Sequence, residues 1–215
     1  SAREARRFRS TVARVRAADE AAGLAAVGAD DPAGSSLTAT VARNLHKLMT
    51  YKDEYEVARL LLLPESRDQY RAIGGRRPAV TYHLHPPVLR RLGMDRKLQL
   101  RRTARPAMRL LRAAKGLRNT PLDPFRWDEV RRIERRMIPE YVDAVDRLVE
   151  QLESSTQAAV AASDEAGPQA HYDELVAIAA LPDQVRGFEQ LKLRRAGDYR
   201  AELARRLAAL DDPTC

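Results

Sequence analysis

The segment from Val130 to Leu152 constrains the fold most, because apolar residues recur in it every three or four positions. That spacing marks one face of an α-helix and predicts a helix over 126–153. The apolar face consists of Val130, Ile133, Met137, Tyr141, Val145, Leu148 and Leu152. A long helix with one apolar face is stable only when other elements cover that face. Pro139 lies inside the pattern and is expected to kink the helix.

The same apolar period predicts that most of the chain is helical. The other expected helices cover 3–27, 37–63, 65–73, 106–116, 155–165, 169–180 and 189–209. Ser35 or Ser36 can cap the second of these helices, because a serine hydroxyl accepts from the first free amides. Short runs of β-favouring residues at 80–84 and 97–100 predict two paired strands, with 86–95 between them.

The expected fold class is therefore mainly α. We expect one multi-helix domain over 1–215, with a small two-stranded β element around 80–100. Hydrophobic residues make up 44% of the chain but aromatic residues only 5%, so the core must consist mostly of Leu, Ala and Val.

The cysteine and apolar residues limit the kinds of site that the chain can form and the cellular compartment in which we expect it. Cys215 is the only cysteine, which excludes a disulfide within the chain and an iron–sulfur cluster held by about four thiolates. No apolar run approaches the roughly 20 residues that span a bilayer. The charged start of the chain is not followed by the apolar segment of a signal peptide. These features predict a cytoplasmic protein that has no membrane partner.

The net charge of +8 is carried mostly by arginine, since only five of the 38 basic residues are lysine. The arginines are interleaved with acidic residues. A nucleic-acid-binding protein would show a face of one sign with aromatic residues or a known reading motif. The sequence shows neither, so the charge favours an acidic protein partner over nucleic acid.

Three charged residues, Lys52, Glu56 and Arg59, interrupt the apolar face of the predicted helix 37–63. Glu56 lies four residues after Lys52 and three before Arg59, so both cations can reach it along the helix. Charges on a core-facing surface are costly unless they are paired. The cluster is therefore either an internal ion-pair network that fixes helix packing or a docking surface for another domain.

A second candidate site lies in the turn before the last predicted helix, where Arg186 and Lys192 flank Gly187. Two cations beside the amides of a helix start could hold a phosphate or carboxylate, such as a group of coenzyme A. The simpler interpretation is a corner between two helices, in which the glycine allows a sharp turn.

Two further positions have ordinary structural explanations. His83 and His85 would lie on one face of a strand and could form a metal pair, but no third ligand is near in sequence. Pro86 and Pro87 more simply make this the rigid end of a strand, so we expect no metal. Asp123 lies between two prolines and is expected to bond to nearby backbone amides at the entry to a helix.

Four stretches together resemble the C-terminal region of fused indolepyruvate ferredoxin oxidoreductases, which belong to the 2-oxoacid:ferredoxin oxidoreductase family. They agree in order and spacing and cover nearly the whole chain. The stretches are KDEYEVARL at 52–60, YHLHPP at 82–87, KGLRNTPLDPF at 115–125, and LPDQVRGF at 181–188 with Lys192. After Gly187 and Phe188 the family pattern continues with Gly-His, where this chain has Glu189-Gln190, so no histidine-based role carries over.

The resemblance implies a parent enzyme that oxidatively decarboxylates aryl 2-oxoacids such as indolepyruvate, yields an acyl-coenzyme A and reduces ferredoxin. Thiamine diphosphate, Mg²⁺ and [4Fe-4S] clusters are expected in that parent, which is also expected to be a homodimer. This chain contains no Gly-Asp-Gly motif, phosphate-binding glycine loop or HExxH motif. We therefore expect no catalytic residue, cofactor or metal here, and an isolated chain without activity.

The resemblance thus predicts an accessory domain whose partners are the catalytic domains of the same polypeptide. A variant of this hypothesis is that Arg59, Arg186 or Lys192 contacts the oxoacid or coenzyme A. The alternative from a different class is a stand-alone helical module that binds protein or nucleic acid.

Overall fold

Helices account for most of the described part of the protein, so the predicted mainly α class is confirmed. The computed structural model describes residues 2–24, 36–50, 54–76, 79–84, 98–101, 104–117, 120–123, 125, 128–162, 167–187 and 189–211. The sequence predicted one domain over 1–215, whereas the contacts gather in two compact units. The first unit comprises Ser1–Tyr51 and Ile133–Cys215, and the second comprises Lys52–Arg132.

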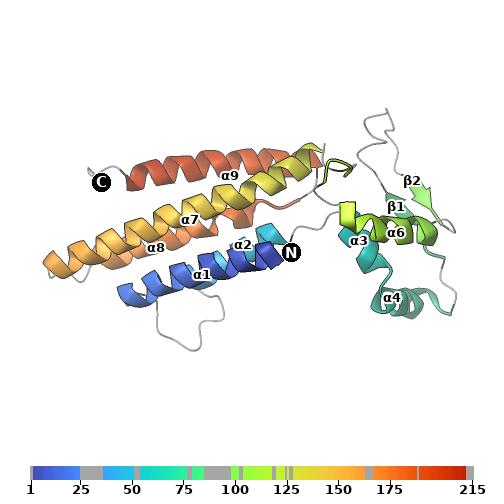
Figure 1. Cartoon of the computed structure of the whole chain (residues 1–215), viewed down its shortest axis with the longest axis horizontal. Helices are drawn as coiled ribbons and strands as arrows, with labels where there is room; N and C mark the ends of the chain where they lie inside the picture. The colour runs from blue at the N-terminus through green and yellow to red at the C-terminus, as the bar shows by residue number, and fades with distance from the viewer. Residues whose placement is uncertain are drawn as a thin grey trace. The chain divides into compact units, whose positions relative to one another are not determined.

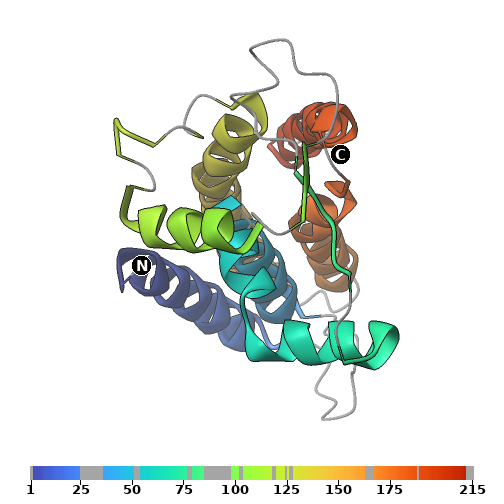
Figure 2. The ribbon, with the colours of Figure 1, turned by 90° about the vertical axis from the view of Figure 1, so that its right-hand side faces the viewer.

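The first unit is built from helices that run roughly along one another in Figures 1 and 2. Its elements are α1 (Ala2–Ala22), α2 (Leu37–Met49), α7 (Glu129–Ala162) from Ile133 onward, α8 (Gly167–Ala180), the 3₁₀ turn η2 (Leu181–Gln184) and α9 (Glu189–Leu210). Helix α2 packs against both α1 and α8, and η2 packs against α2, α8 and α9.

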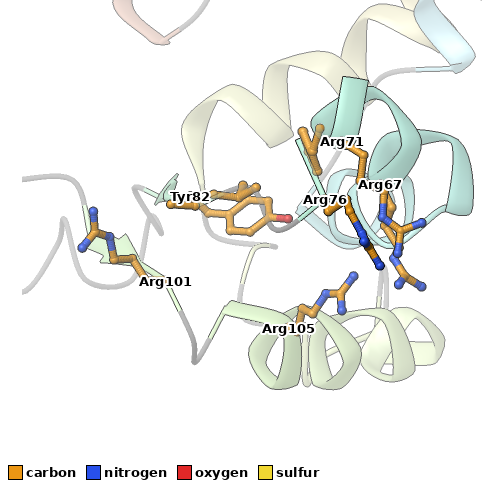
Figure 3. A pocket seen from close by; sticks show the side chains of 9 residues that line it. Arg67, Arg71, Arg76, Tyr82, Arg101 and Arg105 are labelled. Carbon is orange, nitrogen blue, oxygen red and sulfur yellow. The ribbon is translucent and has the colours of Figure 1, made fainter. Parts of the chain in front are cut away.

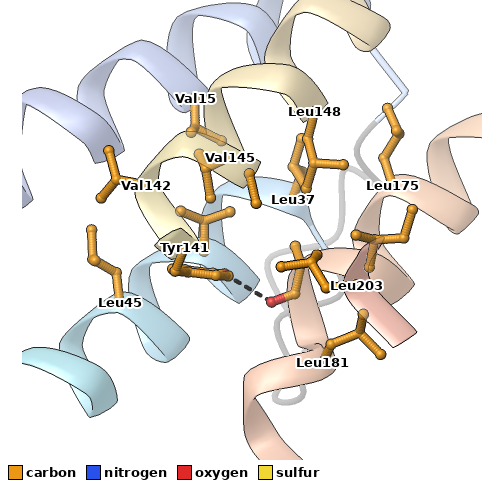
Figure 4. Close-up of a cluster of buried hydrophobic side chains, with 14 of the residues drawn as sticks. Val15, Leu37, Leu45, Tyr141, Val142, Val145, Leu148, Leu175, Leu181 and Leu203 are labelled. Carbon is orange, nitrogen blue, oxygen red and sulfur yellow. Dashed lines mark hydrogen bonds between the residues drawn. The ribbon is translucent and has the colours of Figure 1, made fainter. Parts of the chain in front are cut away.

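The core of the first unit forms along α7, where the predicted apolar face is buried. Five of its seven residues are at most 1% exposed, namely Met137, Tyr141, Val145, Leu148 and Leu152. Val15 of α1, Leu45 of α2 and Leu175 of α8 join this cluster (Figure 4). The Tyr141 hydroxyl donates to the carbonyl oxygen of Ala179 at 2.8 Å, which satisfies its only buried polar atom. Burial raises the pKa of Tyr141 well above its ordinary range.

Helix α7 is longer than predicted, because the separate helix expected over 155–165 is instead its continuation to Ala162. Three hydroxyl residues lie where the break was expected. Ser154 donates to the carbonyl oxygen of Gln151, while Ser155 and Thr156 donate to that of Leu152 at 3.0 and 2.7 Å. Bonding back to the preceding turn lets these side chains stay within a helix.

The predicted helix 37–63 was wrong, because α2 ends at Met49 and α3 begins at Glu54. Ser36 caps α2 as expected, its hydroxyl accepting from the amide of Ala39 at 3.1 Å. Thr50 closes the helix, since its amide and its hydroxyl both donate to the carbonyl oxygen of His46. The apolar face that seemed continuous is therefore divided between the two units.

A buried carboxylate joins three helices of the first unit. Asp19 of α1 is 4% exposed. It accepts from the Tyr172 hydroxyl of α8 at 2.6 Å, and from the amide and hydroxyl of Thr38 at 3.0 and 2.6 Å. The Tyr172 oxygen in turn accepts from the amide of Leu37 at 2.9 Å. Asp19 thus supplies a negative charge and acceptors to the start of α2, where amides have no helical partner.

The second unit contains short elements. They are α3 (Glu54–Leu61), α4 (Pro64–Gly74), β1 (Tyr82–Leu84), β2 (Leu98–Leu100), α6 (Ala104–Ala113) and the 3₁₀ turn η1 (Ala114–Leu117). Pro64 occupies the first turn of α4, and Gly75 ends that helix with a φ of +75°. The two strands pair antiparallel over three residues each, Tyr82 opposite Leu100 and Leu84 opposite Leu98. The predicted 86–95 excursion lies outside the described residues.

The core of the second unit is small and centres on Tyr55 of α3. Its ring meets that of Phe125 edge to face, with centroids 5.2 Å apart. The Tyr55 hydroxyl and the Phe125 amide both donate to Asp123 Oδ1, at 2.9 and 3.0 Å. The expected bond from Asp123 to a nearby amide is confirmed, but the carboxylate joins a turn to α3 rather than capping a helix. Asp128 precedes α7, and its backbone carbonyl oxygen accepts from the amide of Arg132 at 3.0 Å.

We expect Asp19→Asn to lower the free energy of unfolding by about 2–4 kcal/mol, because an amide group presents a donor where three donors converge. Urea unfolding followed by circular dichroism measures this loss. Glu20→Gln is the matched control, since Glu20 is next in α1 but its side chain is 64% exposed. Equal stability of the two variants would contradict a central role for Asp19.

Candidate functional site

The predicted charged cluster lies in the second unit, on α3. Arg59 donates to Glu56 in a forked arrangement, with its Nε 2.9 Å and its Nη2 2.6 Å from Oε1. Lys115 of η1 approaches the other carboxylate oxygen at 3.4 Å. Lys52 lies outside the described residues. The predicted pair Glu56–Arg59 therefore forms. Lys115, which is remote in sequence, links this pair to η1.

Glu56 and its partners are only partly buried. A single helix over 37–63 would instead have placed them on a core-facing surface, as an internal ion-pair network. The side chains of Glu56, Arg59 and Lys115 are 25%, 39% and 48% exposed. The hydrogen bond from Arg59 lowers the pKa of Glu56, and Lys115 adds to this effect. The cause of the difference is the break after α2, because α3 belongs to the second unit, whose core is small.

The second predicted site, around Gly187, lies at a corner of the first unit. Arg186 donates to the Asp183 carboxylate at 2.9 Å and to the Asp183 carbonyl oxygen at 2.8 Å. Lys47 of α2 donates from Nζ to the carbonyl oxygens of Pro182 and Asp183 and to Asp183 Oδ1, each at 3.0 Å. The hydrogen bond from Lys47 is the main cause that lowers the pKa of Asp183, and Arg186 contributes. Sequence reasoning missed Lys47, whose partners lie 135 and 136 residues away.

The remaining predicted cation of this site is also engaged. Lys192 forms an ion pair with Glu134 of α7, a residue that is 6% exposed. Gly187 has a φ of +106°, and a Cβ there would lie 2.9 Å from Leu191 Cδ2, so the turn requires glycine. Because both Arg186 and Lys192 are held by acids of the same unit, the geometry favours a helix–helix corner over an anion site.

Only one of the two histidines of the predicted strand lies among the described residues. His83 lies in β1 opposite Gln99, and His85 lies outside the described residues. Within the described ranges, no group of three or more His, Cys, Asp or Glu side chains could hold a metal ion. None of the helices in the described part is long and apolar enough to cross a membrane.

A basic pocket in the second unit was not predicted from the sequence. It is a cavity of about 560 Å³ between α4, the segment that follows it, β1, and the start of α6. It is lined by Arg67, Tyr70, Arg71, Arg76, Ala79, Val80, Tyr82, Arg101 and Arg105. In Figure 3, Arg67, Arg76 and Arg105 gather on one side of Tyr82, and Arg101 lies on the other.

Some groups of this basic pocket are satisfied by neighbours. Arg71 pairs with Asp68 at 3.5 Å, and Arg101 Nε donates to the Thr81 hydroxyl at 3.1 Å. The rings of Tyr70 and Tyr82 meet edge to face, with centroids 6.3 Å apart. Burial is the largest cause that raises the pKa of Tyr82, and the neighbouring Tyr70 adds to it.

The fold defines a mainly helical protein, and both predicted charge clusters contain ion pairs between described residues. The model of DUF6537, a family of unknown function, matches residues 1–205, and the chain belongs to this family. No curated protein and no solved structure matches it.

We expect Glu56→Gln to lower the free energy of unfolding by no more than about 1 kcal/mol, because the cluster is open to solvent. Urea unfolding tests this, with Glu65→Gln of α4 as the exposed control. A loss of about 3 kcal/mol or more would contradict a solvent-accessible cluster and indicate a buried network.

We expect Lys47→Met to lower the free energy of unfolding at pH 7 by about 1–2 kcal/mol, since it removes three hydrogen bonds at a partly exposed site. The folded-state pKa of Asp183 is depressed, so its contribution is present above the unfolded value of about 4 and is lost as the pH falls.

The stability difference between Lys47→Met and the original chain should therefore shrink on acidification below about pH 4. Thermal unfolding across pH 2.5–7 measures it, and Arg194→Met, at an exposed position of α9, is the control. A difference that stays constant over this range would show that the ion pair with Asp183 contributes nothing.

Proposed function

We propose that this chain is a helical accessory domain of an indolepyruvate, or more broadly 2-oxoacid, ferredoxin oxidoreductase. The parent enzyme would oxidatively decarboxylate aryl 2-oxoacids to acyl-coenzyme A and pass the electrons to ferredoxin in the cytoplasm. The observation that carries the proposal is the resemblance of four stretches, 52–60, 82–87, 115–125 and 181–188, in the same order and spacing.

The contacts within the second unit support a structural role for the resembling stretches. The stretches 52–60 and 115–125 meet there, because Tyr55 and Phe125 share the Asp123 carboxylate. Lys115 also reaches Glu56. Residues that hold each other in place in this way keep the unit folded, whereas catalytic residues would converge on a cavity.

The first unit supports the same role. Residues 181–187 of the fourth stretch form η2 and the turn at Gly187, and Lys47 joins η2 to α2. Its cations are held by carboxylates of the same unit, as at Arg186 and Lys192. A paired cation is poorly placed to bind a substrate anion, so these residues are better explained as the frame of the corner.

The cofactors of the proposed parent do not fit the residues of this chain. A [4Fe-4S] cluster needs about four thiolates, and Cys215 is the only cysteine. Thiamine diphosphate and its Mg²⁺ would require the missing Gly-Asp-Gly motif. The reaction would therefore belong to catalytic domains of the same polypeptide, in a homodimer that uses coenzyme A and ferredoxin, and this chain alone would be inactive.

The experiment is an assay of the native polypeptide that carries this sequence, with indolepyruvate, coenzyme A and oxidised ferredoxin. We expect ferredoxin reduction that needs both substrates. Absence of oxoacid-dependent reduction would overturn the proposed enzyme.

The accessory role is tested in the same assay with Arg59→Gln and Arg186→Gln. Both should leave the KM for oxoacid and for coenzyme A unchanged, as should the surface control Arg194→Gln. A raised KM for coenzyme A in either variant, with the control unaffected, would contradict a purely structural role and assign that arginine to substrate binding.

A further inference from the structure

The basic pocket of the second unit has no part in the proposed function. We propose that it binds a small molecule through a diphosphate group, with Arg67, Arg76 and Arg105 as the residues that hold the phosphates. The inference stands on the geometry of this pocket and does not depend on the oxidoreductase proposal.

The three arginines differ from the other cations of the described candidate sites. Glu56, Asp183 and Glu134 engage the cations of those sites. Arg67, Arg76 and Arg105 instead make no ion pair or hydrogen bond through their side chains with any described residue. Like charges that line one cavity repel one another, and a bound anion would relieve this repulsion.

Arginine is a residue type that suits the binding of phosphate groups. A guanidinium presents a planar fork of donors that matches two oxygens of a phosphate, and it stays charged at any physiological pH. Arg67 comes from α4, Arg76 from the segment after it and Arg105 from the first turn of α6. Donors from separate elements can therefore reach different oxygens of one ligand.

The shape of the pocket favours a small molecule over nucleic acid. A volume of about 560 Å³ lies in the range of small-molecule sites, roughly 300–1,000 Å³. Tyr70 and Tyr82 are part of the wall, and both are only partly exposed. A nucleic-acid surface would extend along a groove, with aromatic side chains open for stacking. Three forks exceed what one phosphate needs, so a diphosphate is the better match.

The experiment is isothermal titration of the 215-residue chain with inorganic pyrophosphate, ADP and inorganic phosphate at one fixed ionic strength. We expect pyrophosphate to bind at least about tenfold more tightly than phosphate. Tighter binding of ADP than of pyrophosphate would identify a nucleoside diphosphate as the ligand class. Weaker binding of ADP would identify the diphosphate group alone.

Two variants locate the site. Arg67→Gln and Arg105→Gln should each weaken pyrophosphate binding by about tenfold or more. Arg67 and Arg105 are both exposed, as is the control position Arg112, so folding should be unchanged in each variant, which circular dichroism verifies. Arg112→Gln is the matched control, because it removes the same charge from α6 about 10 Å from Arg105 and does not line the pocket.

Three results would overturn the inference. The first is binding of pyrophosphate that is no tighter than binding of phosphate. The second is an equal loss of binding in all three variants, which would reveal a general charge effect. Tighter binding of a single-stranded oligonucleotide than of either diphosphate would assign the arginines to nucleic acid instead. None of these results would bear on ferredoxin reduction by the parent enzyme.

Discussion

The carboxylate of Asp19 is the interaction on which the first unit depends. It is buried where α1, the start of α2 and α8 meet, and three donors converge on it. An apolar core made mostly of Leu, Ala and Val could accept helices in several registers, because such side chains are similar in shape. A buried charge accepts only the arrangement that satisfies it, so Asp19 fixes one register for these helices.

The second unit uses the same kind of contact on a smaller scale. Asp123 is 2% exposed and accepts from the Tyr55 hydroxyl and the Phe125 amide. Few aromatic residues are present, yet three of the four buried tyrosines among the described residues, Tyr55, Tyr141 and Tyr172, donate a hydrogen bond to an acid or a carbonyl oxygen, whereas the buried Tyr199 hydroxyl has no partner. Each of these three tyrosines thus adds both buried apolar area and a directional hydrogen bond to a core that consists mostly of aliphatic side chains. The basic pocket differs, because three of its guanidinium groups, those of Arg67, Arg76 and Arg105, make no such bond with a described residue.

The sequence predicted the helices well wherever one apolar face met one core, as along α7. It failed at Thr50, because the apolar period continues across a break that only tertiary structure reveals. Asp19 was missed since a single acid in an amphipathic helix has the pattern of an exposed residue. The basic pocket was missed because Arg67 and Arg105 meet only once α4, the strands and α6 have packed. The apolar period along a segment predicts individual helices. A site whose residues come from several helices and strands depends on how these pack, which the period does not show.

The most direct test of the accessory-domain account is the intact mass of the native polypeptide that carries this sequence, purified with its iron and thiamine diphosphate content measured. The account predicts a chain several times larger than 24.1 kDa that contains both. A native chain of about 24.1 kDa without iron would contradict it. The stand-alone module that binds protein or nucleic acid would then be the better explanation of this fold.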